Sequence, residues 1–333
     1  MSLALVTGAT GQVGSYIVER LRADGWRSRA LVREPGGAEW LAAQGVELVR
    51  GDVLDARQFR DAAAGCDAIF HAAALVTARE GWERYRTANV DGTRNAIEAA
   101  AATGARLLHV SSVAVYGGAA RYRDQPTDES TPLAPLPESA YYARSKRESE
   151  RLVLDAHAAG RIWATAVRPD VIYGRRDRQF VPRLARLLER GFFPVVHGGV
   201  TTLAVVHAAS VADGAVRAVC TDAAGGEAYN LANDFPVTVA EFARLAGEGL
   251  ERRVRLVSFP ISLARPALAA VRGVVRVTGG AALAAQSAGT LDFLSRDNPF
   301  TSERARRELG WSPPVKPEVG IPDAFRWWKE HHD

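Results

Sequence analysis

The sequence predicts an α/β fold, a doubly wound parallel sheet followed by a smaller C-terminal lobe. From residue 1 to about residue 173, short apolar runs alternate with helix-length stretches rich in Ala, Arg and Glu. This alternation is typical of parallel strands joined by crossover helices. After residue 174 it gives way to amphipathic Arg/Leu stretches and Pro-containing turns. A chain of 333 residues that is 47% hydrophobic can bury a sizeable core.

The predicted strands are short, and all but the second are mainly apolar, as parallel strands covered on both faces should be. They span residues 3–7, 29–32, 47–50, 68–71, 106–111 and 163–168. A loop rich in Pro, Asp, Glu and Gly runs between Tyr116 and Tyr141. Its length predicts a functional loop rather than a simple connector.

A glycine-rich turn follows the first strand directly and precedes a helical stretch over residues 15–23. Its expected cofactor contacts are Thr7, Gly8, Gly11, Gln12, Val13 and Gly14. The first glycine allows the tight turn, the second lets the backbone approach a pyrophosphate, and the third lets the helix pack on the strand. Because the turn sits in a complete strand–helix–strand unit, it predicts a Rossmann-type dinucleotide site rather than an ordinary turn.

The end of the second strand indicates which dinucleotide binds. NAD-binding proteins usually carry an acid there for the ribose hydroxyls, but this sequence has Val32 followed by Arg33. A guanidinium can bind a 2′-phosphate in bidentate fashion, so the sequence favours NADP(H). NAD(H) is the alternative, with Arg33 a solvated loop residue and Glu34 at the ribose.

These signals divide the chain into two parts. We assign residues 1–174 to an NADP-binding Rossmann domain and residues 175–333 mainly to a substrate-binding lobe. Strands near 203–207 and 229–231 are expected to return to the main sheet.

Asp52 and Val53 close the third strand and are expected to contact the cofactor. The Asp52 carboxylate can accept a hydrogen bond from the adenine amino group, or it can cap the helix that follows. Asp55 competes for the capping position. The two roles of Asp52 are compatible.

Tyr142 and Lys146 are spaced to share one helix face, which predicts a catalytic pair. A phenol with a pKa near 10 is a poor base at neutral pH, but a neighbouring ammonium is expected to lower that pKa. Lys146 can also hold the ribose hydroxyls. Ser112, at the end of a strand, supplies a hydroxyl to polarise a carbonyl. Tyr141 competes with Tyr142, but the four-residue interval from Tyr141 ends on Ser145.

In these motifs the sequence resembles the extended short-chain dehydrogenase/reductase superfamily over essentially its whole length. Further matching motifs are His71–Ala74, Asn89–Thr93, Val113–Gly117, Arg168–Gly174 and Phe300–Trp311. The resemblance implies that Ala72, Ala73, Ala74 and Asn89 line the cofactor groove, and that Pro169 and Val171 offer backbone to the nicotinamide carboxamide. It implies a structural rather than catalytic role for His71. It also implies a homodimer formed through two helices of the cofactor domain.

The resemblance also narrows the reaction. Related dehydratases carry an Asp-Glu pair after the catalytic hydroxyl, where this chain has Val113 and Ala114. Nucleotide-sugar enzymes usually carry an Arg four residues before a later-strand histidine, where this chain has Leu203 before His207. The loss of a guanidinium from a diphosphate site weakens the sugar interpretation, although Arg183 and Arg186 can compensate.

We therefore expect an oxidoreductase that interconverts a ketone and a secondary alcohol on a bulky, weakly polar substrate. The closest motifs are those of the hydroxysteroid dehydrogenase and dihydroflavonol reductase groups. The expected substrate contacts are Val113, Tyr141, Phe180 and Phe192, although the two Phe side chains can equally belong to the core of the lobe. The alternatives are a nucleotide-sugar 4-epimerase with tightly bound NAD, and a redox-sensing or assembly protein that keeps the dinucleotide site but has lost turnover.

Composition excludes several other classes. A net charge of +4 with scattered Arg argues against a nucleic-acid partner, which leaves a small-molecule substrate. Cys66 and Cys220 lie far apart, and the histidines lack ligand spacing, so we expect no metal and a reducing cytoplasm. We expect no leader, and the apolar tract 263–285 is broken by Arg and Pro, which argues against a transmembrane span.

Overall fold

A computed structural model describes the chain except for residues 1, 77–80, 119–125, 233–234, 261–292 and 333. The apolar tract 263–285 therefore lies outside the described residues. The chain forms two compact units. Unit 1 comprises Met1–Ile172, Val206–Asp234 and Phe300–Pro314, and unit 2 comprises Tyr173–Val205, Phe235–Pro299 and Val315–Asp333.

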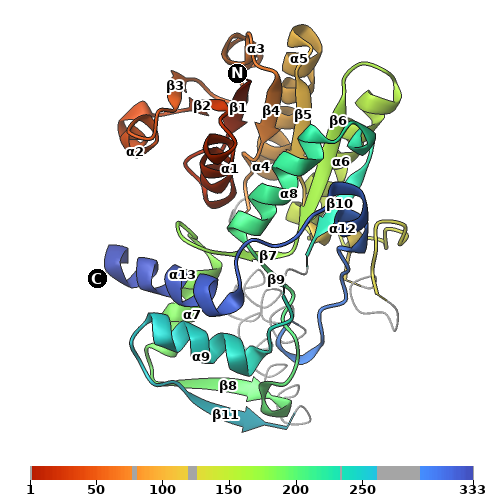
Figure 1. Ribbon diagram of the computed structural model, residues 1–333. Helices are drawn as coiled ribbons and strands as arrows, with labels where there is room; N and C mark the ends of the chain where they lie inside the picture. The colour runs from red at the N-terminus through yellow and green to blue at the C-terminus, as the bar shows by residue number, and fades with distance from the viewer. Residues whose placement is uncertain (1, 77–80, 119–125, 233–234, 261–292, 333) are drawn as a thin grey trace. The chain divides into compact units, whose positions relative to one another are not determined.

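Unit 1 is built on a seven-stranded parallel sheet in the order β10-β6-β5-β4-β1-β2-β3 (Figure 1). Its strands are β1 (Leu3–Thr7), β2 (Arg27–Val32), β3 (Glu47–Arg50), β4 (Ala68–His71), β5 (Arg106–Val110), β6 (Ala164–Pro169) and β10 (Ala228–Leu231). The chain winds outward from β1 in one direction and from β4 in the other, which confirms the predicted doubly wound α/β class. Ligands of such sheets bind outside the carboxyl ends of the strands, where the winding reverses. Here that point lies between β1 and β4.

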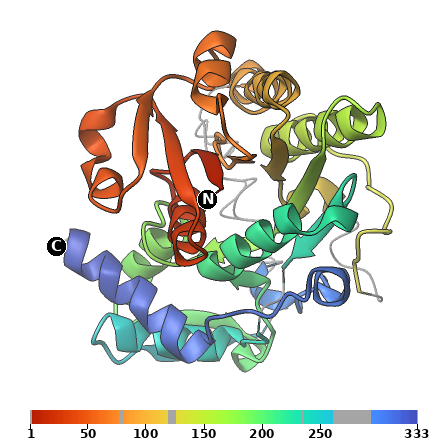
Figure 2. The same cartoon turned by 45° about the horizontal axis from the view of Figure 1, so that its top comes forward.

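Helices cover both faces of this sheet because β-strand side chains alternate between faces. On β1, Ala4 and Val6 join one buried cluster, with α1 (Gln12–Ala23) and α8 (Ala208–Cys220), which lie side by side (Figure 2). Leu5 joins the cluster on the opposite face. That cluster includes residues of α3 (Ala56–Ala63), α5 (Gly92–Thr103) and α6 (Tyr141–Ala158). The remaining described α-helices of unit 1 are α2 (Glu39–Ala42), α4 (Trp82–Tyr85) and α12 (Glu303–Leu309).

The two strands expected to return to the main sheet behave differently. The segment around 229–231 becomes β10, whose backbone pairs with β6 from Ala166 to Pro169. The expectation for 203–207 is wrong, because β9 (Val205–His207) instead pairs with β7 (Val171–Tyr173) in a separate two-stranded sheet. The reason is that β10 already occupies the edge of the sheet beside β6.

Unit 2 is organised around aromatic side chains. Phe242 of α9 (Val239–Gly249) contacts the rings of Tyr173, Phe180 and Phe325 edge-on, at centroid distances of 5.6, 5.7 and 6.1 Å. Phe180 and Phe325 come from α7 (Phe180–Leu188) and α13 (Pro317–His332). The strands β8 (Phe192–Val196) and β11 (Arg255–Phe259) pair in parallel. This core gives unit 2 its own packing centre.

Candidate active site

The glycine turn joins β1 to α1, and its geometry requires glycine at two positions. Gly8 has a φ of +68°, and a Cβ there would lie 2.8 Å from the Ala73 nitrogen. A Cβ on Gly14 would lie 2.2 Å from the carbonyl oxygen of Gly8. Gly11 caps α1 without a side-chain hydrogen bond. The first backbone N–H groups of the helix are therefore available to an anion, and the turn fits a dinucleotide pyrophosphate.

Arg33 and Glu34, which follow β2 directly, are the side chains expected to distinguish NADP(H) from NAD(H). Val32, the last residue of the strand, is buried, whereas Arg33 and Glu34 are both exposed. In the part of the chain that the structure describes, neither forms an ion pair. The guanidinium of Arg33 is thus accessible to a phosphate beside the end of the strand.

The competition between Asp52 and Asp55 for the helix cap is decided by their hydrogen bonds. The Asp55 carboxylate accepts bonds from the Arg57 and Gln58 nitrogens, both at 3.0 Å, and so caps α3. Asp52 instead accepts from the Leu54 nitrogen at 3.0 Å. Asp52 and Val53 are partly exposed, and their roles toward the adenine stay predictions.

Asn89 ties the segment after β4 to α6. Its amide donates to the Leu75 carbonyl oxygen at 2.9 Å and to the Ser145 hydroxyl at 2.9 Å, while its oxygen accepts from the Leu75 nitrogen at 2.7 Å. Asn89 lies in a π-helical segment, Arg86–Asp91, a rare geometry that is frequent at functional sites. Ala72–Ala74, expected to line the cofactor groove, lie between β4 and this anchored segment and are partly exposed.

Ser112 and Tyr142, 30 positions apart in sequence, are brought together by the fold. Ser112 lies just after β5 and caps the short helix Val113–Tyr116 by accepting from the Ala114 nitrogen at 3.2 Å. The Ser112 side chain lies close enough to the Tyr142 phenol to lower the pKa of that phenol. Tyr142 lies in the first turn of α6.

The pKa of Tyr142 is raised, whereas the sequence predicted that Lys146 would lower it. Burial of the phenol is the main cause, because it disfavours the phenolate. The nearby Ser112 side chain opposes this increase only in part, and Tyr85 adds to it. The phenol therefore keeps its proton at neutral pH.

Lys146 is buried at 3% exposure, and its ammonium donates to the Val110 carbonyl oxygen at 2.6 Å. Burial lowers the pKa of Lys146 to about 8, and the carboxylate of Glu150 opposes that decrease. The side chain is therefore mainly cationic at pH 7 and titrates just above it.

Two buried histidines lie near Lys146, and both are neutral. Burial and the charge of Lys146 lower the pKa of His71 to about 3 and that of His109 well below its usual value. His71 Nδ1 hydrogen-bonds the Thr7 hydroxyl at 2.9 Å. This contact agrees with a structural role for His71.

Tyr85 is a site residue that the sequence analysis missed. Its ring lies 6.2 Å from that of Tyr141, and its hydroxyl donates to the Val76 carbonyl oxygen at 3.2 Å. It is also close enough to Tyr142 to influence its pKa. The sequence feature that could have identified Tyr85 is its position one helical turn before Asn89, which places both residues on one face of a helix.

The expected substrate contacts lie in different surroundings. Val113 is 3% exposed and packs in a cluster with Val115, Tyr116 and Phe300. Tyr141 is partly exposed at the start of α6. Phe180 and Phe192 belong to unit 2, the first beside Phe242 and the second 46% exposed on β8.

Two further residues are expected to contact the nicotinamide carboxamide. Pro169 is buried at the end of β6, and Val171 is partly exposed. Their binding roles stay predictions.

Two other kinds of site are absent from the described residues. No group of three or more His, Cys, Asp or Glu side chains there is arranged to hold a metal ion. Among the same residues, no helix has the length and apolar character needed to cross a membrane.

A doubly wound sheet with a glycine turn at its reversal point and a Ser, Tyr and Lys group at the same edge defines a dinucleotide-dependent enzyme. Residues 4–232 match the NAD dependent epimerase/dehydratase family. The chain belongs to that family and thus to the extended short-chain dehydrogenase/reductases. It is an NAD(P)-dependent enzyme acting on a CH–OH group, as its similarity to reductases and dehydrogenases indicates.

Similar proteins cover nearly the whole chain. A 4-hydroxy-2-methyl-3-oxo-4-farnesyl-3,4-dihydroquinoline-1-oxide ketoreductase of Stigmatella aurantiaca is 33% identical over 96% of this chain and 95% of its own. A 2-alkyl-3-oxoalkanoate reductase of Shewanella oneidensis is 31% identical over 96% and 85%. The crystal structure of gox2253 superposes with a TM-score of 0.78 at 27% identity and covers 100% of this chain and 99% of its own.

Proposed function

We propose that this protein is an NADP(H)-dependent ketoreductase that interconverts a ketone and a secondary alcohol on a bulky, weakly polar substrate. The observation that carries the proposal is that Ser112 lies beside the phenol of Tyr142, and that the helix bearing Tyr142 also bears the buried ammonium of Lys146. This arrangement suits proton transfer to a carbonyl oxygen, and it lies at the sheet edge where the glycine turn provides a dinucleotide site.

In the proposed mechanism each group has one task. The nicotinamide, when bound, supplies the hydride that forms the new C–H bond at the carbonyl carbon. Ser112 donates a hydrogen bond to the carbonyl oxygen, and Tyr142 transfers its phenolic proton to that oxygen. The ammonium of Lys146 stabilises the phenolate that Tyr142 becomes. The reverse reaction runs the same proton path backwards.

NADP(H) is the proposed cofactor, and NAD(H) is the alternative. Support comes from Arg33, which is exposed directly after β2 where a 2′-phosphate would need a cation. Thr7, Gly8, Gly11, Gln12, Val13 and Gly14 would hold the pyrophosphate, and Asp52, Val53, Asn89, Pro169 and Val171 the rest of the dinucleotide.

The proposed substrate class follows the relatives. The two reductases described above act, by their names, on a farnesylated quinoline oxide and on alkyl oxoalkanoates, which are large or apolar ketones. A 3beta-hydroxysteroid-dehydrogenase/decarboxylase of Arabidopsis thaliana is 29% identical over 95% of this chain. Tyr141 and Tyr85, whose rings lie 6.2 Å apart, offer aromatic surface for such a substrate.

The competing proposal is a nucleotide-sugar 4-epimerase. Solved structures of similar fold include MoeE5 with UDP-glucose and NAD, at 23% identity and a TM-score of 0.71. That likeness concerns the fold alone. Leu203, which stands where a diphosphate-binding Arg is usual, is 5% exposed and argues against a nucleotide sugar.

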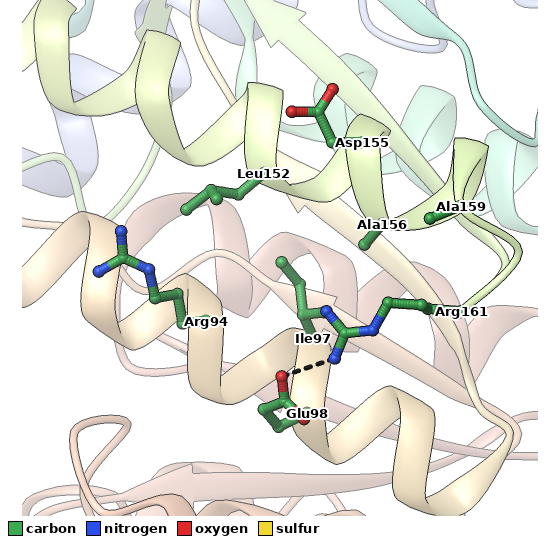
Figure 3. A pocket seen from close by; sticks show the side chains of 8 residues that line it. All are labelled: Arg94, Ile97, Glu98, Leu152, Asp155, Ala156, Ala159 and Arg161. Atoms are coloured by element: carbon green, nitrogen blue, oxygen red, sulfur yellow. Dashed lines mark hydrogen bonds and ion pairs between the residues drawn. The ribbon is translucent and has the colours of Figure 1, made fainter.

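We further propose a homodimer through α5 and α6. Figure 3 shows a groove between these helices. It is lined by Arg94, Ile97, Glu98, Leu152, Asp155, Ala156, Ala159 and Arg161. Apolar side chains at the centre and the Arg161–Glu98 ion pair at 2.7 Å suit an interface with a second copy.

We also propose a cytoplasmic location. Cys66 and Cys220 are free thiols, in keeping with that proposal.

One experiment separates the two enzymatic proposals. The protein is titrated with NADPH and with NADH, and turnover is then measured on a panel of steroid, flavonoid and aryl ketones. The ketoreductase proposal predicts preferential NADPH binding and consumption with at least one ketone. Protein purified with tightly held NAD and without net turnover on any ketone would favour the epimerase.

A further inference from the structure

A buried ion pair lies behind the catalytic helix, between α6 and β6. The guanidinium of Arg168 donates two hydrogen bonds to the carboxylate of Glu150, at 3.0 and 2.7 Å. The two side chains are only 8% and 5% exposed. A buried pair of this kind is a weak source of stability, because desolvation of both charges offsets their attraction. Its presence beside the site therefore calls for a functional explanation.

The Arg168 guanidinium is held by Tyr116, in the short helix Val113–Tyr116, as well as by Glu150. A further nitrogen donates to the Tyr116 hydroxyl at 2.7 Å, and its carbon lies 5.0 Å above the Tyr116 ring. Tyr116 in turn donates to the Asn230 side-chain oxygen on β10 at 2.9 Å. These contacts fix the guanidinium in one place and leave the carboxylate of Glu150 little freedom.

Glu150 lies one helical turn after Lys146, and both residues are on the buried face of α6. The titratable groups around the ammonium are His71 on β4, His109 on β5 and Tyr142 on α6 itself. Both histidines are neutral, and Tyr142 is protonated at neutral pH. Among the described residues, Glu150 supplies the negative charge that counters the burial of Lys146.

We propose that Glu150 and Arg168 are positioning residues that keep Lys146 in its ammonium form. Arg168 holds the buried carboxylate of Glu150 in place through its two hydrogen bonds. The carboxylate then stabilises the positive charge on Lys146. This inference rests on the proposed role of Lys146 in catalysis, but its test requires no turnover.

The chain makes a direct test practical, because Lys146 is one of only three lysines. Protein labelled with [13Cε]lysine is titrated between pH 6 and 11 and followed by NMR. The Lys146 signal is assigned by its loss in Lys146→Arg. Lys146 is expected to titrate near pH 8.

The decisive comparison is between two carboxylates of the same helix. Glu150→Gln is expected to lower the midpoint of Lys146 by about one pH unit, since a nearby unit charge acts strongly in a buried site. Glu148, which is 33% exposed beside Arg94, is the matched control, and Glu148→Gln is expected to leave the midpoint unchanged. Equal midpoints in the two variants would overturn the proposal.

A second variant covers the case in which Glu150→Gln does not fold. The double substitution Glu150→Leu with Arg168→Met replaces the pair by apolar side chains, a change that buried ion pairs often tolerate. Its Lys146 midpoint is also expected to fall, because Glu150 is the charge that acts on Lys146. A midpoint equal to that of the parent would overturn the proposal. If Lys146 of the unmodified protein titrates as expected but the protein reduces no ketone, the ketoreductase proposal is refuted and the proposal for Glu150 and Arg168 stands.

Discussion

Ketone reduction by this enzyme should slow as the pH rises through 8. Two protonated groups are required, the phenol of Tyr142 and the ammonium of Lys146. The pKa of Tyr142 is raised above its ordinary value near 10, so the phenol keeps its proton up to pH 9. The pKa of Lys146 is about 8, so this group loses its charge within the working range.

The size of the effect follows from that pKa. With a midpoint at about 8, the cationic fraction of Lys146 is about 0.9 at pH 7 and about 0.1 at pH 9. The value of kcat/KM for reduction should therefore fall about tenfold between these two pH values. The assay is the initial rate of NADPH oxidation with subsaturating ketone from pH 6 to pH 10.

The matched control for this profile is Lys146→Arg. A guanidinium stays charged throughout the range, so this variant should be slower but should lack the fall above pH 8. Circular dichroism at each pH verifies that the fold persists. A parent profile that stays flat to pH 10, or one that falls on the acid side, would refute the role given to the ammonium.

Three further predictions concern the cofactor site and stability. Arg33→Ala should weaken NADPH binding at least about tenfold in a calorimetric titration and leave NADH binding unchanged, since it removes a charge-assisted bond worth about 1.5–3 kcal/mol. Gly14→Ala should weaken binding of both cofactors, because its Cβ would lie 2.2 Å from the Gly8 oxygen. Lys146→Met should raise the free energy of unfolding at pH 7 by about 1–3 kcal/mol in urea titrations, because an apolar side chain avoids burying an ammonium. That gain should shrink as the pH rises from 8 toward about 10.4, where the folded parent loses the proton that the unfolded chain still holds.

These predictions have their own controls and contrary outcomes. Arg57, 85% exposed on α3, is the control for Arg33, and equal NADPH affinities in the two Ala variants would remove Arg33 from the phosphate site. Gly36, where an added Cβ meets its nearest atom at 3.9 Å, is the control for Gly14. Unchanged affinity in Gly14→Ala would contradict the account of the turn. A loss of stability in Lys146→Met would show that burial of the ammonium is not costly.

The sequence predicts the sheet well because its strands are marked by local composition. Residues 3–7, 47–50 and 68–71 have the same bounds in the structure, and the first two of these strands are followed directly by Gly8 and Gly51. The second strand begins at Arg27 rather than at residue 29, because its backbone pairs with β1 although its first side chains are polar. Backbone pairing leaves no signal in composition.

The parts of the site that depend on long-range burial could not be predicted from the sequence. Spacing places Tyr142 and Lys146 on one helix face, but whether burial or the ammonium dominates the pKa of Tyr142 depends on what covers α6. The same holds for the Arg168–Glu150 pair, which forms between β6 and α6. Likewise, the position of residues 203–207 depends on which later strand occupies the edge beside β6.

The central claim is that Tyr142, and not its neighbour Tyr141, transfers the proton to the carbonyl oxygen. The most direct test compares Tyr142→Phe with Tyr141→Phe in NADPH-dependent reduction of the best ketone from the panel, with NADPH affinity measured for both. Loss of the acid should lower kcat by about 10²–10⁴-fold in Tyr142→Phe while NADPH still binds. Tyr141→Phe should retain activity within about tenfold of the parent, since it loses no proton-transfer step. A Tyr142→Phe variant that keeps most of the parental activity would contradict the account.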